Sequence, residues 1–136
     1  MGTRSLTRVY NEDGKEIICL YRQYDGYPEG HGLELAKFLN GFNMTDGIYG
    51  IPGSKNLPKK LANGMGCLAA QLVAHFKTEP GQFYLYPPGT KDVWEEYEYH
   101  VGTLCKTGPT ITCIEVDGET LFTGQPAAFI EKFGEK

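Results

Sequence analysis

Residues 16–39 read EIICLYRQYDGYPEGHGLELAKFL, in which an apolar run is followed by a polar loop and then by an amphipathic run. The first run is rich in β-branched side chains and predicts a strand over residues 16–23. Along it Ile18, Leu20 and Arg22 share one face, so the arginine follows two apolar side chains to the rim of the core. A strand, an irregular loop and a helix in this order require both kinds of secondary structure around one core.

Two hairpins and further helices surround this stretch. Asp-Gly pairs at residues 13–14 and 117–118 predict tight turns between strands. Residues 42–60 contain several glycines and prolines and indicate a long loop that could serve as a lid. The other predicted elements are helices over residues 32–39, 62–77 and 126–133 and strands over residues 5–10, 83–86, 94–101, 110–116 and 120–123.

The predicted order of elements is ββααββββ with a short helix at the end. All 136 residues fit one domain. Helices placed between an N-terminal hairpin and a run of strands favour an α+β fold, with a mostly antiparallel sheet of about six strands and the helices on one face. The 94–101 strand alternates polar and apolar side chains, so we expect Glu96 and Glu98 to face water.

Charge and composition limit the classes of partner. The net charge of −4 argues against binding to DNA or RNA polymers, although a local basic pocket can still hold a small anion. Neither a signal peptide nor a membrane-spanning run is recognisable, so we expect a cytoplasmic protein that does not bind membranes. The cysteines lack C-x-x-C spacing and are expected to be reduced and largely buried. They are Cys19, Cys67, Cys105 and Cys113.

The loop over residues 22–32 is predicted to bind an anion. Its glycines let a ligand approach the backbone, Pro28 stiffens it, and the helix that follows offers unpaired N–H groups at the positive end of its dipole. The three arginines of the chain, Arg4, Arg8 and Arg22, all lie on the first two predicted strands. Arginine grips phosphate through two parallel hydrogen bonds. The alternative is that these arginines pair with carboxylates on a solvated face.

A second candidate anion site lies at the start of the 62–77 helix. Asn63 can cap this helix and the glycines after it expose N–H groups, although a plain cap explains the same residues. In the first site, aromatic rings can stack on a base and Asp25 can accept a hydrogen bond from a ribose hydroxyl. The candidate ligand-binding residues are therefore Arg4, Arg8, Arg22, Tyr24, Asp25, Tyr27, His31, Asn63, Gly64, Phe83 and Tyr84.

Catalytic chemistry finds little support in the sequence. Cys67 and His75 are eight residues apart and cannot touch within one helix, and the three histidines are too scattered for a zinc site. No Walker or dinucleotide-binding glycine motif is present. We therefore expect binding without turnover, with no catalytic residue, cofactor or metal. The alternatives are a small hydrolase or transferase that uses Cys67 or His31, and a protein-interaction inhibitor that uses its tyrosine-rich strands.

Four runs carry a resemblance to a known family: MGTRSL at residues 1–6, YRQYDGYP at 21–28, ANGMGCLAAQL at 62–72 and FYLYPPG at 83–89. With them the chain resembles small phage and prophage proteins, namely the first family of Thoeris anti-defence proteins. The resemblance ends at residue 89. It implies a homo-oligomer, either a dimer or a hexamer built from dimers, that acts in the host cytoplasm during infection. It also implies sequestration, without cleavage, of the cyclic ADP-ribose-type signal made by bacterial TIR enzymes. Some members of the family also hold cyclic trinucleotides of the related CBASS pathway at a separate site.

Overall fold

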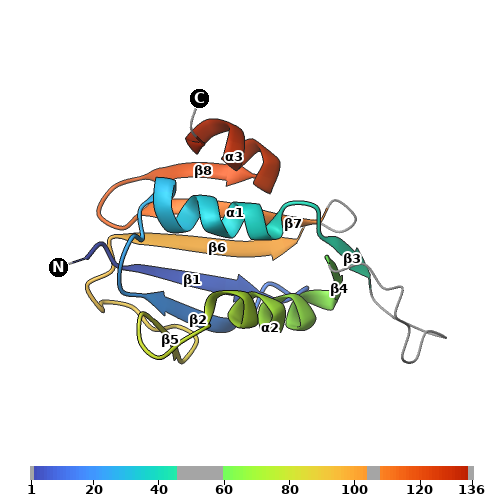
Figure 1. Cartoon of the computed structure of the whole chain (residues 1–136), viewed down its shortest axis with the longest axis horizontal. Helices are drawn as coiled ribbons and strands as arrows, with labels where there is room; N and C mark the ends of the chain where they lie inside the picture. Colours follow the sequence, from blue (N-terminus) through green and yellow to red (C-terminus); the bar gives the residue numbers. More distant parts are fainter. Residues whose placement is uncertain (1, 46–59, 104–107, 135–136) are drawn as a thin grey trace.

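The protein is built on a mixed six-stranded sheet, which Figure 1 shows nearly face on. The computed structural model describes residues 2–45, 60–103 and 108–134. The strand order is β5-β2-β1-β6-β7-β8, in which β1 and β6 are parallel and the other neighbours are antiparallel. The strands are β1 (Ser5–Tyr10), β2 (Glu16–Arg22), β5 (Phe83–Tyr86), β6 (Tyr97–Thr103), β7 (Pro109–Glu115) and β8 (Thr120–Gly124).

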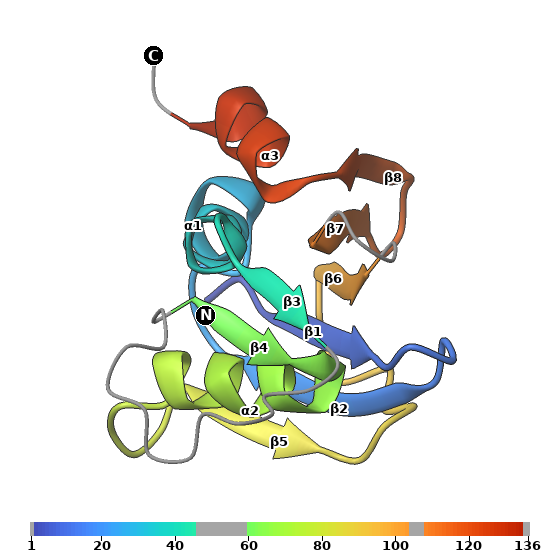
Figure 2. The same ribbon diagram turned by 90° about the vertical axis from the view of Figure 1, so that its right-hand side faces the viewer.

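The helices α1 (Leu33–Leu39), α2 (Gly64–Phe76) and α3 (Pro126–Phe133) lie on the same side of the sheet, as Figure 2 shows from its edge. A π-helical turn, η1 (Pro28–Gly32), leads directly into α1. This arrangement confirms the predicted α+β class, the six strands and the short C-terminal helix. It follows from amphipathic helices that bury their apolar stripes on a sheet.

Three predicted boundaries were wrong. The predicted 42–60 loop begins with a strand, β3 (Asn43–Thr45), which pairs in parallel with β4 (Leu61–Asn63). That second strand delays the start of α2 to Gly64, and residues 46–59 of the predicted loop lie outside the described residues. The strand predicted from residue 94 begins at Tyr97, because Trp94 has a φ of 70°, a left-handed conformation that cannot continue a strand.

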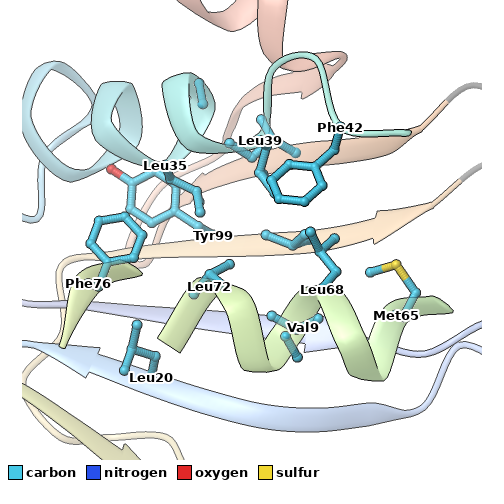
Figure 3. Close-up of a cluster of buried hydrophobic side chains, with 14 of the residues drawn as sticks. Val9, Leu20, Leu35, Leu39, Phe42, Met65, Leu68, Leu72, Phe76 and Tyr99 are labelled. Atoms are coloured by element: carbon cyan, nitrogen blue, oxygen red, sulfur yellow. The ribbon is translucent and has the colours of Figure 1, made fainter. Parts of the chain in front are cut away.

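The main core fills the space between the helices and the sheet (Figure 3). Leu35 and Leu39 of α1 face Leu68 and Leu72 of α2 across the centre, and the ring of Tyr99 of β6 lies beside Leu35. All five side chains are fully buried. Burying such a side chain stabilises the fold by about 1.5–3 kcal/mol, so this cluster accounts for the placement of both helices.

A smaller cluster lies on the opposite face of the sheet, where Leu6, Cys19 and Tyr21 are buried with Tyr86 and Val93 packed against them. The sulfur of Cys19 is thereby buried, as is that of Cys113 in the main core. Both thiols are free, and so is the half-buried Cys67. Cys105 lies outside the described residues.

Candidate ligand-binding groove

The loop that joins β2 to α1 is more helical than its sequence indicates. The η1 turn takes up the second half of the predicted loop, and its amides already have partners. The amide of His31 donates to the carbonyl of Asp25 at 2.7 Å, and that of Gly30 donates to the carbonyl of Tyr27 at 2.9 Å. The helix start after Gly32 therefore does not offer the row of unpaired N–H groups that the sequence predicts.

The glycines of this loop serve internal packing. A Cβ atom on Gly26 would lie 2.8 Å from the Cβ atom of Ser5, and one on Gly32 would lie 2.7 Å from the ring of Phe129. The one left-handed residue of the loop is Asp25, with a φ of 62°. The glycines thus allow the protein's own side chains and backbone, and not a ligand, to pack closely against the loop.

A buried polar chain holds Arg22 in place. The Nη1 group of Arg22 lies 3.2 Å from Nδ1 of His31, and Nε2 of His31 lies 2.7 Å from Oγ1 of Thr7. Because arginine only donates, Nδ1 accepts and the ring proton sits on Nε2, which donates to Thr7. Burial, together with the nearby charge of Arg22, lowers the pKa of His31 to about 3. His31 is therefore neutral and serves to orient the arginine.

The other edges of the Arg22 guanidinium reach toward the surface. Its Nε donates to the carbonyl of Tyr24 at 2.6 Å, and its Nη2 forms an ion pair of 3.2 Å with Glu34. The guanidinium also lies 5.1 Å from the centre of the Phe83 ring. Only 6% of the Arg22 side chain is exposed, whereas 52% of the Glu34 side chain is exposed. Both residues line a polar depression of about 260 Å³ that also contains Glu79.

A larger depression of about 690 Å³ adjoins the first one between α1 and α2. The two share Glu34 and His75 as lining residues, and together they are called here the α1–α2 groove. Its larger part is mostly apolar, with a few polar groups at its rim. The residues that line this part are Glu34, Lys37, Phe38, Phe42, Lys60, Gln71, Ala74 and His75.

The structure does not bring the three arginines together. Arg8 points to the face opposite Arg22, where its guanidinium makes two hydrogen bonds of 3.1 Å to Glu98 and an ion pair of 3.0 Å with Glu16. These bonds, that of Glu98 first, raise the pKa of Arg8 above its ordinary value. Arg4 comes just before β1 and contributes to the pKa of Tyr21, which belongs to the cluster on that same opposite face. Two of the three arginines thus lie away from the α1–α2 groove.

Glu98 departs from the expectation that the glutamates of β6 face water. Its side chain is 18% exposed and lies between Arg8 and His100. The hydrogen bond from His100, with those from Arg8, lowers the pKa of Glu98 to about 2. Glu96 is exposed, as predicted. The carboxylate of Glu98 is thus held in an ion pair with Arg8 and does not face water as predicted.

The second predicted anion site is taken by a carboxylate of the protein itself. Asn63 makes no side-chain capping bond at the start of α2. Instead Oε2 of Glu12, in the β1–β2 turn, accepts the amide proton of Met65 at 2.7 Å, and it lies next to Gly64. A helix N-terminus does attract an anion here, as its dipole requires, but the anion belongs to the chain.

The remaining predicted residues lie in different places relative to Arg22. Phe83 lines the polar depression, whereas Tyr84 faces the opposite side of the sheet near Tyr21. Tyr24 and Tyr27 are exposed, and the hydroxyl of Tyr27 donates to Oδ1 of Asp25 at 3.1 Å. Of the predicted site, the structure therefore gathers Arg22, His31 and Phe83 at the polar depression, whereas neither loop tyrosine lines the α1–α2 groove.

Sequence reasoning missed the aromatic and polar residues of the α1–α2 groove. On α2 these are Gln71, Ala74 and His75, at spacings of three and four, which places them on one side of the helix beside the buried stripe. Phe38 and Lys37 come from α1. One sequence pattern could have indicated this groove. On each of two neighbouring helices, polar and aromatic residues lie along one edge of the apolar stripe.

Within the described ranges, no three potential ligands from His, Cys, Asp and Glu are grouped so as to hold a metal, and no helix is long and apolar enough to cross a membrane. Comparisons with family models, with curated proteins and with solved structures found no match for this chain. The fold and the groove define the protein as an α+β domain with a candidate small-ligand site. Function is therefore inferred from the geometry of that site.

Proposed function

We propose that the protein binds a small, phosphate-bearing nucleotide in the α1–α2 groove and holds it without cleaving it. The observation that carries the proposal is the state of Arg22. Its guanidinium is buried and oriented by two neutral acceptors, His31 and the carbonyl of Tyr24, while its one carboxylate partner, Glu34, is half exposed. A phosphate that displaced Glu34 would meet a pre-oriented guanidinium edge.

The contacts of His31 support sequestration without turnover. His31 is the histidine that a hydrolase or transferase, the alternative function, would use as its base. Both ring nitrogens of His31 are engaged, with Arg22 and with Thr7, and the ring is fully buried. A base with these contacts cannot take a proton from a substrate or a thiol. Cys67 accepts a hydrogen bond from Gln71 at 3.2 Å, and amide N–H groups do not activate a thiol as a base does.

The resemblance in the sequence extends this proposal to a ligand class. We propose a phage-encoded anti-defence protein that sequesters a cyclic ADP-ribose-type signal, with cyclic oligonucleotides as further candidates. In this role it would act as a homo-oligomer in the host cytoplasm. A pocket with an arginine at one end and aromatic rings at the other suits such a ligand, which carries both phosphates and a base.

The test is calorimetry with cyclic ADP-ribose isomers and cyclic oligonucleotides, followed by heat release and mass analysis of the bound molecule. We expect saturable binding and recovery of the intact ligand. Arg22→Ala should weaken binding by about 1.5–3 kcal/mol, the range for a charge-assisted hydrogen bond. Lys37→Ala, at the groove rim, tests the same site without disturbing a buried residue, and Lys15→Ala in the exposed β1–β2 turn is the matched control.

Two results would refute the proposal. One is the absence of binding to every one of these nucleotides by the folded wild-type protein. The other is recovery of a cleaved ligand, which would point to an enzyme. Equal affinity of wild-type protein and a folded Arg22→Ala variant would remove Arg22 from the site.

A further inference from the structure

We infer that the larger part of the α1–α2 groove is a binding site for a planar heteroaromatic ring of the purine type. The inference rests on the proposed function, because it assigns the base of the ligand to one part of the groove and its phosphate to the other. The residues that carry it are Phe38, His75, Lys37 and Gln71, all of which line this part of the groove.

An aromatic stack forms one wall of the pocket. The rings of Phe38 and His75 are stacked, with centroids 4.6 Å apart and planes inclined by 26°. Phe42 also contacts Phe38, with ring centroids 5.1 Å apart and planes inclined by 57°. His75 is exposed, while Phe42 is buried in the core. The stack is therefore anchored at its inner end and presents an imidazole at its outer end, where a further ring can extend it.

Hydrogen-bonding groups beside the stack favour a heteroaromatic ring over a purely apolar one. The amide nitrogen of Gln71 donates to the carbonyl of Leu61 at 2.9 Å and to the sulfur of Cys67, which fixes the amide. Its Oε1 has no hydrogen-bond partner among the described residues, so it can accept from an exocyclic amine. A purine that carries an amino group supplies that donor.

Two lysines at the rim have different roles. The ammonium of Lys60 donates to the carbonyls of Lys37 and Asn40, at 2.9 Å and 2.6 Å, and so caps the end of α1. The ammonium of Lys37 has no polar partner within the described part of the chain. It is therefore available to a ring nitrogen or to a phosphate.

The dimensions and position of the pocket agree with this assignment. Its volume of about 690 Å³ lies within the range of about 300–1,000 Å³ that ligand pockets occupy. It adjoins the polar depression of Arg22, because Glu34 and His75 line both parts. A base on the stack and a phosphate at Arg22 would thus belong to one continuous ligand.

The experiment is an NMR titration with adenosine, a purine nucleoside that carries no phosphate, on protein labelled in histidine and phenylalanine. We expect the ring resonances of His75 and Phe38 to shift in a saturable way. His75→Ala should weaken adenosine binding by about tenfold, within the range of base stacking on aromatic side chains. The matched control is His100→Ala, a histidine on the opposite face of the sheet, which should leave the affinity unchanged.

The outcomes separate this inference from the proposed function. Adenosine shifts at His75 that are absent with 2-phenylethanol support a heteroaromatic site. Equal shifts with 2-phenylethanol, or adenosine binding that His75→Ala leaves unchanged, would overturn it. If the cyclic nucleotides bind in calorimetry but leave the His75 and Phe38 resonances unmoved, the ring site is wrong and the proposed function stands. If adenosine binds at His75 but no phosphorylated nucleotide binds, the proposed function fails.

Discussion

The neutral, buried His31 predicts that the protein loses stability in mild acid. In the unfolded chain a histidine has a pKa of about 6.5, whereas burial and Arg22 lower the pKa of His31 in the fold to about 3. Below pH 6.5 the unfolded state therefore binds a proton that the folded state does not bind. Stability is complete above pH 6.5 and falls as the pH decreases toward 3.

The size of this loss follows from proton linkage. Each pH unit in the window removes about 1.36 kcal/mol, so lowering the pH from 7 to 5 should reduce the free energy of unfolding by about 2 kcal/mol. That is a large share of the roughly 5–15 kcal/mol by which domains of this kind are stable. Glu98 contributes little between pH 7 and pH 5, because the stability that its lowered pKa of about 2 supplies is lost only below the unfolded-state pKa of a glutamate, about 4.3.

Urea unfolding followed by circular dichroism at pH 7 and pH 5 measures the effect, with His31→Gln as the comparison. Glutamine can donate to Thr7 and accept from Arg22 but does not titrate. This variant should be less stable than wild type at pH 7 and should lack the decrease of about 2 kcal/mol. His75→Gln is the matched control, because His75 is exposed and its replacement should leave the decrease in place. The same pH dependence in wild type and His31→Gln would refute the reasoning.

Four further predictions follow from the contacts described above. Glu34→Gln should tighten the binding of inorganic phosphate, measured by calorimetry, because it removes the carboxylate that competes with phosphate for Arg22. Weaker binding would contradict this role of Glu34. Arg8→Met should destabilise the fold by about 3–5 kcal/mol in thermal or urea unfolding, since it leaves Glu16 without its arginine and Glu98 with His100 alone in a partly buried site. A loss below about 1 kcal/mol would contradict this. Glu12→Ala should cost about 1 kcal/mol of stability by removing the carboxylate at the start of α2, and an unchanged unfolding midpoint would show that the bond to Met65 contributes nothing. Cys19 and Cys113 should resist labelling by an aromatic disulfide at pH 8 until the protein unfolds, because burial raises the pKa of each thiol to about 11. Rapid labelling of either thiol in the folded protein would contradict its burial.

The fold was predictable where local chemistry determines it. In the β1–β2 turn the side chain of Asn11 accepts the amide protons of Asp13 and Lys15, and Gly14 adopts a φ of 81°, as the Asp-Gly signal predicts. The start of β6 was not predictable in this way. Trp94 is left-handed and 80% exposed, and the carboxylate of Glu95, which accepts the amide proton of Val93 at 2.9 Å, helps to hold this turn. Neither Gly nor Asn marks that conformation in the sequence.

The position of Arg8 shows why the site was only partly predictable. Tyr10 pairs with Glu16, and an unbroken antiparallel register from that pair would place Arg8 opposite Ile18, on the same face as Arg22. The register shifts by one residue between Val9 and Tyr10, so Arg8 pairs with Cys19 instead. A shift of one residue moves a side chain to the other face of the sheet. The bulge leaves no distinctive residue pattern, and it separates two arginines that the sequence places on neighbouring strands.

The two buried arginines of this sheet differ in how their charge is balanced, and this difference is the reason that we propose Arg22, and not Arg8, as the ligand-binding arginine. Arg8 has two carboxylates, Glu98 and Glu16, whose side chains are only 18% and 14% exposed, so its charge is already neutralised by fixed partners. Arg22 has two neutral acceptors and one carboxylate, Glu34, that is 52% exposed and can turn into water. Glu34 can therefore leave Arg22 and become fully solvated, whereas moving Glu98 away from Arg8 would separate two charges that are both largely buried. This is why we propose that an incoming phosphate replaces the carboxylate at Arg22 and not the carboxylates at Arg8.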